Sequence, residues 1–217
     1  MKTKSIKFLL LVFLVLPASG YPQSQLVGLG RYVIGVTTPD SLNSTDFQEQ
    51  EQAYVKGTLT LPCTHIRSFK SNKVQGADVL TTNLLLLFYD NKLFKLICDY
   101  PDELKAAFLA KNGNGISRPA RHVQVGVKNK STSLVLTGEV WQNADIEVLA
   151  VHYKGDKADY QIEETDRLMI ASKTISALAS DCDLQNVEPL IEEFDKMLND
   201  HRDQHPERRT IKQIRKP

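Results

Sequence analysis

The chain has 217 residues, 41% of them hydrophobic and 24% charged, with 27 Lys and Arg against 26 Asp and Glu. That apolar fraction is too high for a wholly disordered chain, and 11 Gly and 9 Pro are too few for a collagen-like or low-complexity sequence. Proteins that neutralise many phosphates normally carry a clear basic excess, so the near-neutral balance argues against a nucleic-acid partner.

The first 20 residues have the layout of a secretory signal peptide. Lysines at positions 2, 4 and 7 precede an unbroken apolar run, Phe8 to Leu16, and small residues follow at positions 18 to 20. The run is about half of the roughly 20 residues that span a bilayer, and no second run of that length follows. We therefore expect cleavage near Gly20, no transmembrane anchor, and export to the periplasm or the extracellular space.

The mature chain divides into three parts by composition. Residues 21–30, which contain Gln, Ser and Gly, predict a flexible leader, with order beginning near Arg31. Residues 31–203 hold all the periodic apolar pattern and predict a single domain. Residues 204–217 are basic, with no acid after Arg208, and predict a flexible tail that adds at most a weak contact with anionic surfaces.

Four segments open the domain. The apolar run Tyr32 to Val36 predicts a short strand. Thr38-Pro39-Asp40 supplies a capping hydroxyl, a first-turn Pro and a first-turn acid, which together predict the start of a short helix. Residues 43–53 lack apolar periodicity and predict a loop. Tyr54 to Leu61 alternates in a way that is typical of a half-buried strand.

The strongest pattern in the domain is a hairpin. Leu84 to Tyr89 and Leu93 to Cys98 are apolar runs joined by Asp90-Asn91, a two-residue turn candidate. Both runs are more apolar than alternation requires, so we expect the hairpin at the centre of a covered sheet. A helix is predicted from Pro101 to Lys111, and Asn112-Gly113 supplies its stop.

The remainder predicts a meander followed by a helix. Strand candidates recur at about ten-residue spacing, which favours antiparallel pairing. They are His122–Val127, Ser133–Trp141, Asp145–Tyr153, Tyr160–Glu163 and Arg167–Ala171. Val187 to Leu198 has the apolar spacing of an amphipathic helix. The predicted fold class is therefore α+β, with a mostly antiparallel sheet of about six to eight strands and two or three helices packed on one face.

Three cysteines leave at least one unpaired in an oxidising compartment. A bridge between Cys63 and Cys98 is the favoured bridge, because Cys63 follows a strand-like run, Cys98 ends another, and the two thiols are close if those strands are neighbours. A bridge from Cys182 is the alternative, and three buried thiols without any bridge is another, since a free Cys packs as a small hydrophobe.

Several residue groups could carry chemistry, and each has an ordinary structural interpretation. On a strand, Cys63-Thr64-His65 would place a thiol and an imidazole on one face, but Pro62 just before the pair indicates a loop equally well, and no third group to orient the imidazole is evident. His201 and His205 have helical i, i+4 spacing, which is half of a zinc site, and Pro206 follows directly. The group Asp181-Cys182-Asp183 lacks the further oxygen ligands of a calcium loop. We interpret these three groups as structural and predict no catalytic residue, cofactor or metal.

Two further considerations bear on function. Trp141, Tyr153 and Tyr160 could form an aromatic binding face, although packing within the sheet is the favoured interpretation. Without a nucleophile elbow, a phosphate loop or a metal cluster, the sequence favours an exported, non-enzymatic binding module for a protein, peptide or glycan. The alternative is a secreted hydrolase with scattered active-site residues, for which His65 or His122 beside an acid in a cleft would be the evidence.

Overall fold

The computed structural model describes residues 26–58, 61–76, 79–127, 130–156, 162–183 and 196–197. In this part of the chain an eight-stranded antiparallel sheet has the order β3-β5-β6-β7-β11-β10-β9-β8. Its strands are β3 (Gln48–Glu49), β5 (Ile66–Gly76), β6 (Val79–Tyr89), β7 (Lys92–Asp99), β8 (Ile116–Val127), β9 (Lys130–Asn143), β10 (Ile146–Asp156) and β11 (Ile162–Ser172). The smaller elements are β1 (Gly28–Leu29), β2 (Tyr32–Val33), β4 (Tyr54–Val55), β12 (Cys182–Asp183), the helices α1 (Asp102–Asn112) and α2 (Lys173–Leu178), and the 3-10 turns η1 (Pro39–Ser41) and η2 (Ala179–Asp181).

The predicted hairpin is confirmed at the centre of the sheet. Asp90 and Asn91 form its turn with φ values of 47° and 61°, the positive pair that a tight hairpin turn requires. β7 has β6 on one side and β11 on the other, and its residues 93 to 98 are all buried. Both faces of the hairpin are therefore covered, in agreement with its two continuous apolar runs.

The predicted meander is also confirmed, with four strands in place of five candidates. β8, β9, β10 and β11 pair antiparallel in succession, and β11 closes the sheet against β7. The candidates Tyr160–Glu163 and Arg167–Ala171 belong to one strand, β11. α1 begins after Pro101 and stops at Gly113, where φ is 71°, so this helix lies where the sequence predicted it. It carries the chain from the central strand β7 to the edge strand β8.

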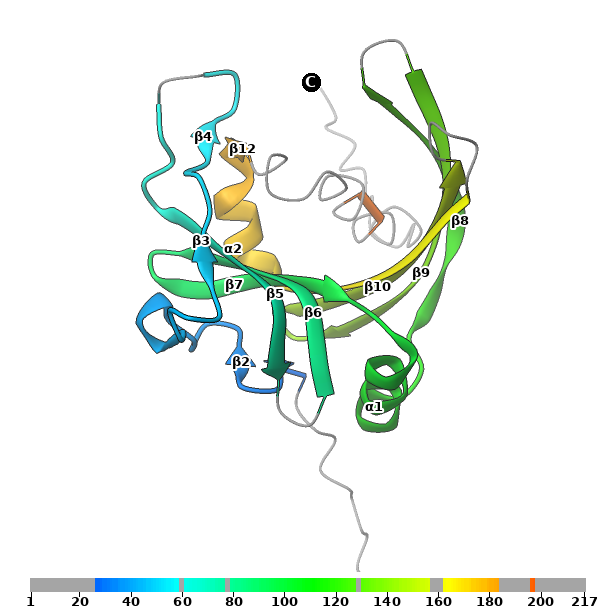
Figure 1. Ribbon diagram of the computed structural model, residues 1–217, viewed down its shortest axis with the longest axis horizontal. Helices are drawn as coiled ribbons and strands as arrows, with labels where there is room; N and C mark the ends of the chain where they lie inside the picture. The colour runs from blue at the N-terminus through cyan, green and yellow to red at the C-terminus, as the bar shows by residue number, and fades with distance from the viewer. Residues whose placement is uncertain are drawn as a thin grey trace, which may run out of the picture.

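The two helices lie on opposite faces of the sheet, which corrects the expectation that the helices share one face. Figure 1 shows the sheet curving around α2 and residues 196–197, with α1 outside the curve. We call the face that carries α1 the convex face and the one that carries α2 the concave face. Leu104 and Phe108 of α1 belong to the convex core cluster, whereas Ile175 and Ala179 pack in the concave one.

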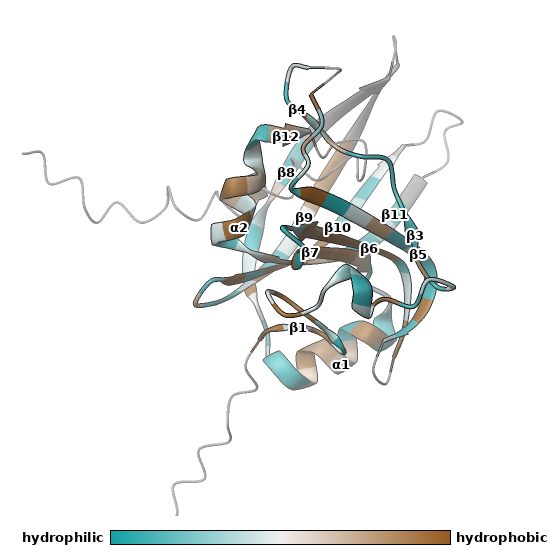
Figure 2. Ribbon diagram, turned by 90° about the vertical axis from the view of Figure 1, so that its left-hand side faces the viewer, coloured by the Kyte–Doolittle hydropathy of each residue, from teal (hydrophilic) through white to brown (hydrophobic). Residues whose placement is uncertain are grey.

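Each face has its own core because both sides of the central strands are apolar. The convex cluster contains Leu86, Leu96 and Cys98, and the concave cluster contains Leu85 and Ile97. The hydropathy colouring of Figure 2 marks the central strands as hydrophobic. At about 25 cal/mol per Å² of apolar surface, this double-sided burial is the main stabilising contribution to the fold.

Two N-terminal predictions need correction: the ordered chain begins earlier than predicted, and the predicted strand near Tyr54 is shorter. Leu26 is buried in the convex cluster and β1 pairs with β2, so the described part of the predicted leader packs on the body and order begins before Arg31. The predicted strand Tyr54–Leu61 is limited to β4 in the described residues. Thr38 precedes η1 but makes no capping hydrogen bond through its side chain.

The C-terminal predictions lie largely outside the described residues. Of the predicted helix Val187–Leu198, only Lys196 and Met197 are described; both are helical, and Met197 is buried in the concave cluster. The signal peptide and the basic tail 204–217 fall outside the described ranges. None of the described helices has the length and apolar character needed to cross a bilayer.

Candidate functional site

A small pocket of about 200 Å³ lies between α1 and the convex face of the sheet. It gathers polar groups from four parts of the chain that are far apart in sequence: the start of α1 with Tyr100 and Lys105, β9 with Glu139, β10 with His152 and β11 with Asp166. The strand order places β9, β10 and β11 side by side, so every second residue of each strand faces α1.

His152 and Asp166 form the clearest polar pair in this pocket. They are directly opposite each other in the β10–β11 ladder, and His152 Nδ1 lies 2.9 Å from Asp166 Oδ1. Both side chains are partly open, at 43% and 42% exposed, so solvent reaches the pair. A carboxylate at Nδ1 orients the imidazole and leaves Nε2 available to a ligand.

Tyr100 places a buried hydroxyl at the same pocket. The residue is only 4% exposed, and its hydroxyl has no hydrogen-bond partner within the described ranges. Burial raises the pKa of this phenol, and the negative charges of Glu139 and Asp166 raise it further. The hydroxyl is therefore protonated at any physiological pH and can donate a hydrogen bond to a ligand.

Trp141 forms one wall of the pocket and is part of the core. Its Nε1 donates to the carbonyl oxygen of Gly113 at 2.9 Å, and its ring meets Phe108 edge-on at a centroid distance of 5.2 Å. A Cβ on Gly115 would lie 2.8 Å from this ring, so only glycine allows the close approach. The favoured interpretation of Trp141 as a packing residue is in agreement with these contacts.

The aromatic binding face considered from sequence does not form in the described residues. Trp141 belongs to the convex cluster, whereas Tyr153 packs against the concave one. The two rings point to opposite sides of the sheet, and Tyr160 lies outside the described residues.

The disulfide joins Cys63 to Cys182, so the favoured pairing of Cys63 with Cys98 is wrong and the alternative from Cys182 is right. Their Cα atoms are 6.1 Å apart across 119 residues. The reason is that Cys63 lies in the concave cluster and Cys98 in the convex one, on opposite faces of the sheet. Cys98 is a fully buried free thiol, and burial raises its pKa to about 12.

Because Cys63 is bonded to Cys182, it has no free thiol to act with His65, and the thiol–imidazole hypothesis is wrong. His65 instead stacks on Tyr89 and pairs with Asp90 at 2.6 Å on an exposed turn, where the two side chains are 62% and 61% exposed. His122, the other histidine considered for a hydrolase, is exposed on β8. Among the described histidines, His152 is paired with an acid and lines the pocket beneath α1.

The metal hypotheses gain no support from the described residues. Asp181-Cys182-Asp183 contains the disulfide, and the carbonyl oxygen of Asp181 accepts the backbone N–H of Lys56. His201 and His205 lie outside the described residues. No group of three His, Cys, Asp or Glu in the described ranges could hold a metal ion.

Comparison with protein-family models, with curated proteins and with solved structures finds no match for this chain. The assignment of function therefore depends on the pocket itself. Sequence reasoning missed His152, Asp166 and Tyr100 because their proximity follows from strand register, which places residues 14 positions apart opposite each other. The turn-forming residues Gly155-Asp156 were the signal available in the sequence, and they do not fix that register.

Proposed function

We propose that this protein is an exported, non-enzymatic binding module that holds a small polar group in the pocket beneath α1. The observation that carries the proposal is the Tyr100 hydroxyl, buried and without a partner in the described part of the chain. Buried polar groups are nearly always hydrogen-bonded, so an orphaned donor at a pocket wall is best explained by a ligand that completes it.

The size of the pocket limits the ligand. Ligand pockets usually measure about 300 to 1,000 Å³. At about 200 Å³ this one suits a single polar unit, such as one sugar residue of a glycan or one side chain of a peptide. His152, Asp166 and Glu139 supply further hydrogen-bonding groups around Tyr100.

Export is supported by the signal-peptide pattern and by the disulfide. Structural disulfides form and persist in oxidising compartments and are rare in the cytosol. The Cys63–Cys182 bridge is therefore the feature expected of a protein that acts in the periplasm or outside the cell.

The test uses Trp141 as a reporter, because it is the one Trp in the chain and it lines the pocket. Panels of monosaccharides and of free amino acids are titrated into the mature protein while Trp fluorescence is recorded. We expect one class to change the signal, and Tyr100→Phe to abolish the change while leaving the melting temperature unaltered. Tyr153→Phe is the matched control because Tyr153 packs on the concave side of the sheet.

Two outcomes would contradict this function. If no compound in either panel changes the Trp141 signal, the pocket is not a ligand site of the proposed kind. If Tyr100→Phe binds as tightly as the parent, the buried hydroxyl does not contact the ligand.

The secreted hydrolase is the second candidate, and the His152–Asp166 pair favours it. Ser117 and Thr137 also line the pocket, although no hydrogen bond joins either hydroxyl to His152 within the described ranges. Turnover of nitrophenyl esters or glycosides that disappears in His152→Ala would support a hydrolase. Saturable binding without turnover would support the binding module.

A further inference from the structure

Arg118 is a buried cation on the concave face, opposite to the pocket beneath α1. It belongs to β8 and pairs with Gly138 of β9, one residue beyond the Ser117–Glu139 pair that faces the pocket. Arg118 is only 7% exposed, and neither its Nε nor its Nη2 has a hydrogen-bond partner in the part of the chain that the structure describes. A buried charge without a partner is strongly unfavourable, so binding of an anion to this side chain would be favourable.

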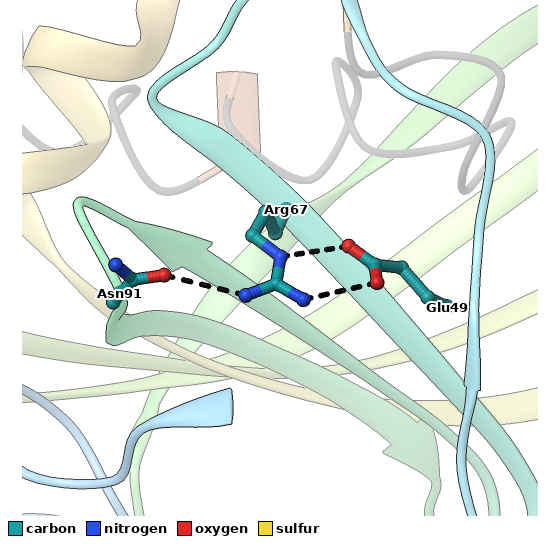
Figure 3. A network of polar contacts seen from close by, with 3 residues as sticks. All are labelled: Glu49, Arg67 and Asn91. Atoms are coloured by element: carbon teal, nitrogen blue, oxygen red, sulfur yellow. Dashed lines mark hydrogen bonds and ion pairs between the residues drawn. The ribbon is translucent and has the colours of Figure 1, made fainter. Parts of the chain in front are cut away.

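The two nitrogens define the kind of anion. Nε and Nη2 carry parallel N–H bonds on one edge of the guanidinium plane, which matches two oxygens of a carboxylate or phosphate. Arg67 of this protein shows the arrangement when it is filled: Nε donates to Glu49 Oε1 at 2.7 Å and Nη2 to Oε2 at 3.0 Å (Figure 3). Arg118 presents the same edge with no acid of the described residues on it.

The acid nearest along this row of the sheet is already used. Successive strand partners from Arg118 are Gly138, Val151, Arg167 and Asp99, so Asp99 is four strands away. The Asp99 carboxylate accepts hydrogen bonds from Arg167 at 2.6 Å, Thr82 at 2.8 Å and Asn83 at 2.6 Å. Because these three donors already bind the Asp99 carboxylate, Asp99 does not pair with Arg118.

Among the described residues, the strand neighbours of Arg118 on this face are apolar. Gly138, opposite it, has no side chain, and Met197 approaches the position that a Cβ there would occupy. Val140 and Ile116, the next pair on this face, add hydrocarbon, and Ile116 is 56% exposed. A single cation in such a site neutralises one negative charge, whereas a dianionic phosphate would keep a second charge out of water at high cost.

We propose that Arg118 binds the carboxylate of a small organic acid through its Nε and Nη2 edge, with the hydrocarbon part of the acid against Ile116. This site is independent of the pocket beneath α1, because Arg118 and Tyr100 lie on opposite faces of the sheet. Loss of one leaves the other intact.

The test measures binding of butyrate to the mature protein by calorimetry and by thermal melting, in a buffer free of carboxylate and phosphate. Sodium chloride at equal ionic strength controls for screening, and inorganic phosphate forms a second arm. The variants are Arg118→Met and Arg118→Lys, which lack the guanidinium edge formed by Nε and Nη2. The matched control is Arg67→Met, because in the parent protein the same edge of Arg67 already binds Glu49.

We expect butyrate to raise the melting temperature of the parent and of Arg67→Met, and both Arg118 variants to bind it at least about tenfold more weakly, since bidentate charge-assisted bonds are strong. Without butyrate, Arg118→Met should melt no lower than the parent, because the substitution removes an uncompensated buried charge.

Four results would overturn the proposal. They are a parent that does not bind butyrate, Arg118 variants that bind it equally well, tighter binding of phosphate than of butyrate, and an Arg118→Met protein that melts far below the parent or fails to fold. The last result would mean that an acid of the chain itself already binds Nε and Nη2 of Arg118.

Discussion

Leu86 of β6 lies directly opposite Leu96 of β7, and both side chains are fully buried in the convex cluster. Replacing either by Ala should lower the free energy of unfolding by about 2 to 5 kcal/mol, because a cavity is left where the packed side chain was. That is a large part of the roughly 5 to 15 kcal/mol that stabilises a domain. Urea unfolding measures the loss.

Leu80→Ala is the control for this pair, since Leu80 lies on the same strand and is 40% exposed. It should unfold close to the parent. If Leu86→Ala and Leu96→Ala also unfold within a few tenths of a kcal/mol of the parent, the hairpin does not hold the core together.

The disulfide should contribute substantially to stability. Changing both Cys63 and Cys182 to Ala should cost about 2 to 5 kcal/mol, because the bridge restricts the unfolded chain across 119 residues. Native protein treated with iodoacetamide should take up no label, since Cys98 is buried and its pKa is raised to about 12. Mass spectrometry after denaturation should find one label per chain, and three after reduction; a native protein labelled at Cys98 would contradict its burial.

Asp145 should make stability depend on acid pH. Its Oδ1 accepts the N–H and the hydroxyl of Thr174, at 2.9 and 2.6 Å, and its Oδ2 accepts the hydroxyl of Ser172. Desolvation alone would raise the pKa of this carboxyl, but the hydrogen bonds from Ser172 and Thr174, with Lys173 nearby, lower it below its ordinary value.

Because the folded-state pKa is the lower one, the stabilisation is complete above the ordinary Asp value of about 3.9 and is lost as the pH falls through the folded-state value. Asp145→Ala should cost about 0.5 to 2 kcal/mol at neutral pH, as for other capping acceptors. Urea unfolding should show that difference shrinking below about pH 4. A difference that is constant with pH would mean that the charge of Asp145 does not contribute.

The signal peptide is tested by the N-terminus of the exported protein. Expression in an exporting host and N-terminal sequencing should give Tyr21 as the first residue, after cleavage behind Gly20. Met1 retained in a membrane fraction would contradict cleavage.

The tail should be dispensable for folding. After Pro206 only Ile211 and Ile214 are apolar, too few to bury a useful area at about 25 cal/mol per Å². Truncation after Asp203 should leave the melting temperature nearly unchanged and remove any salt-sensitive binding to anionic vesicles. A truncated chain that melts much earlier would place the two isoleucines in the core.

The elements predicted correctly are those with a local cause. The β6–β7 hairpin follows from two apolar runs and a turn that tolerates positive φ, and α1 ends where Gly113 allows it. β5 was missed because two of its buried residues, Ser68 and Ser71, are polar, and its place in the sheet comes from pairing with β6.

The cysteine pairing and the candidate pocket required information that local patterns lack. The β6–β7 ladder changes register between Leu87 and Phe88, so alternation along the sequence does not tell which face Cys98 occupies. His152 and Asp166 meet only because the β10–β11 register places them opposite each other.

The position of Cys98 also has a consequence for the order of events during synthesis. The chain is made from its N-terminus, so Cys63 and Cys98 are both present before Cys182 exists, and an oxidant could join the wrong pair first. The β6–β7 hairpin pairs neighbouring segments and hairpins form within about 1 to 10 μs, far faster than disulfide chemistry. We therefore expect the hairpin to form before oxidation and, as the sheet assembles, to hold Cys98 on the convex face, away from Cys63 on the concave one, which disfavours the wrong bridge.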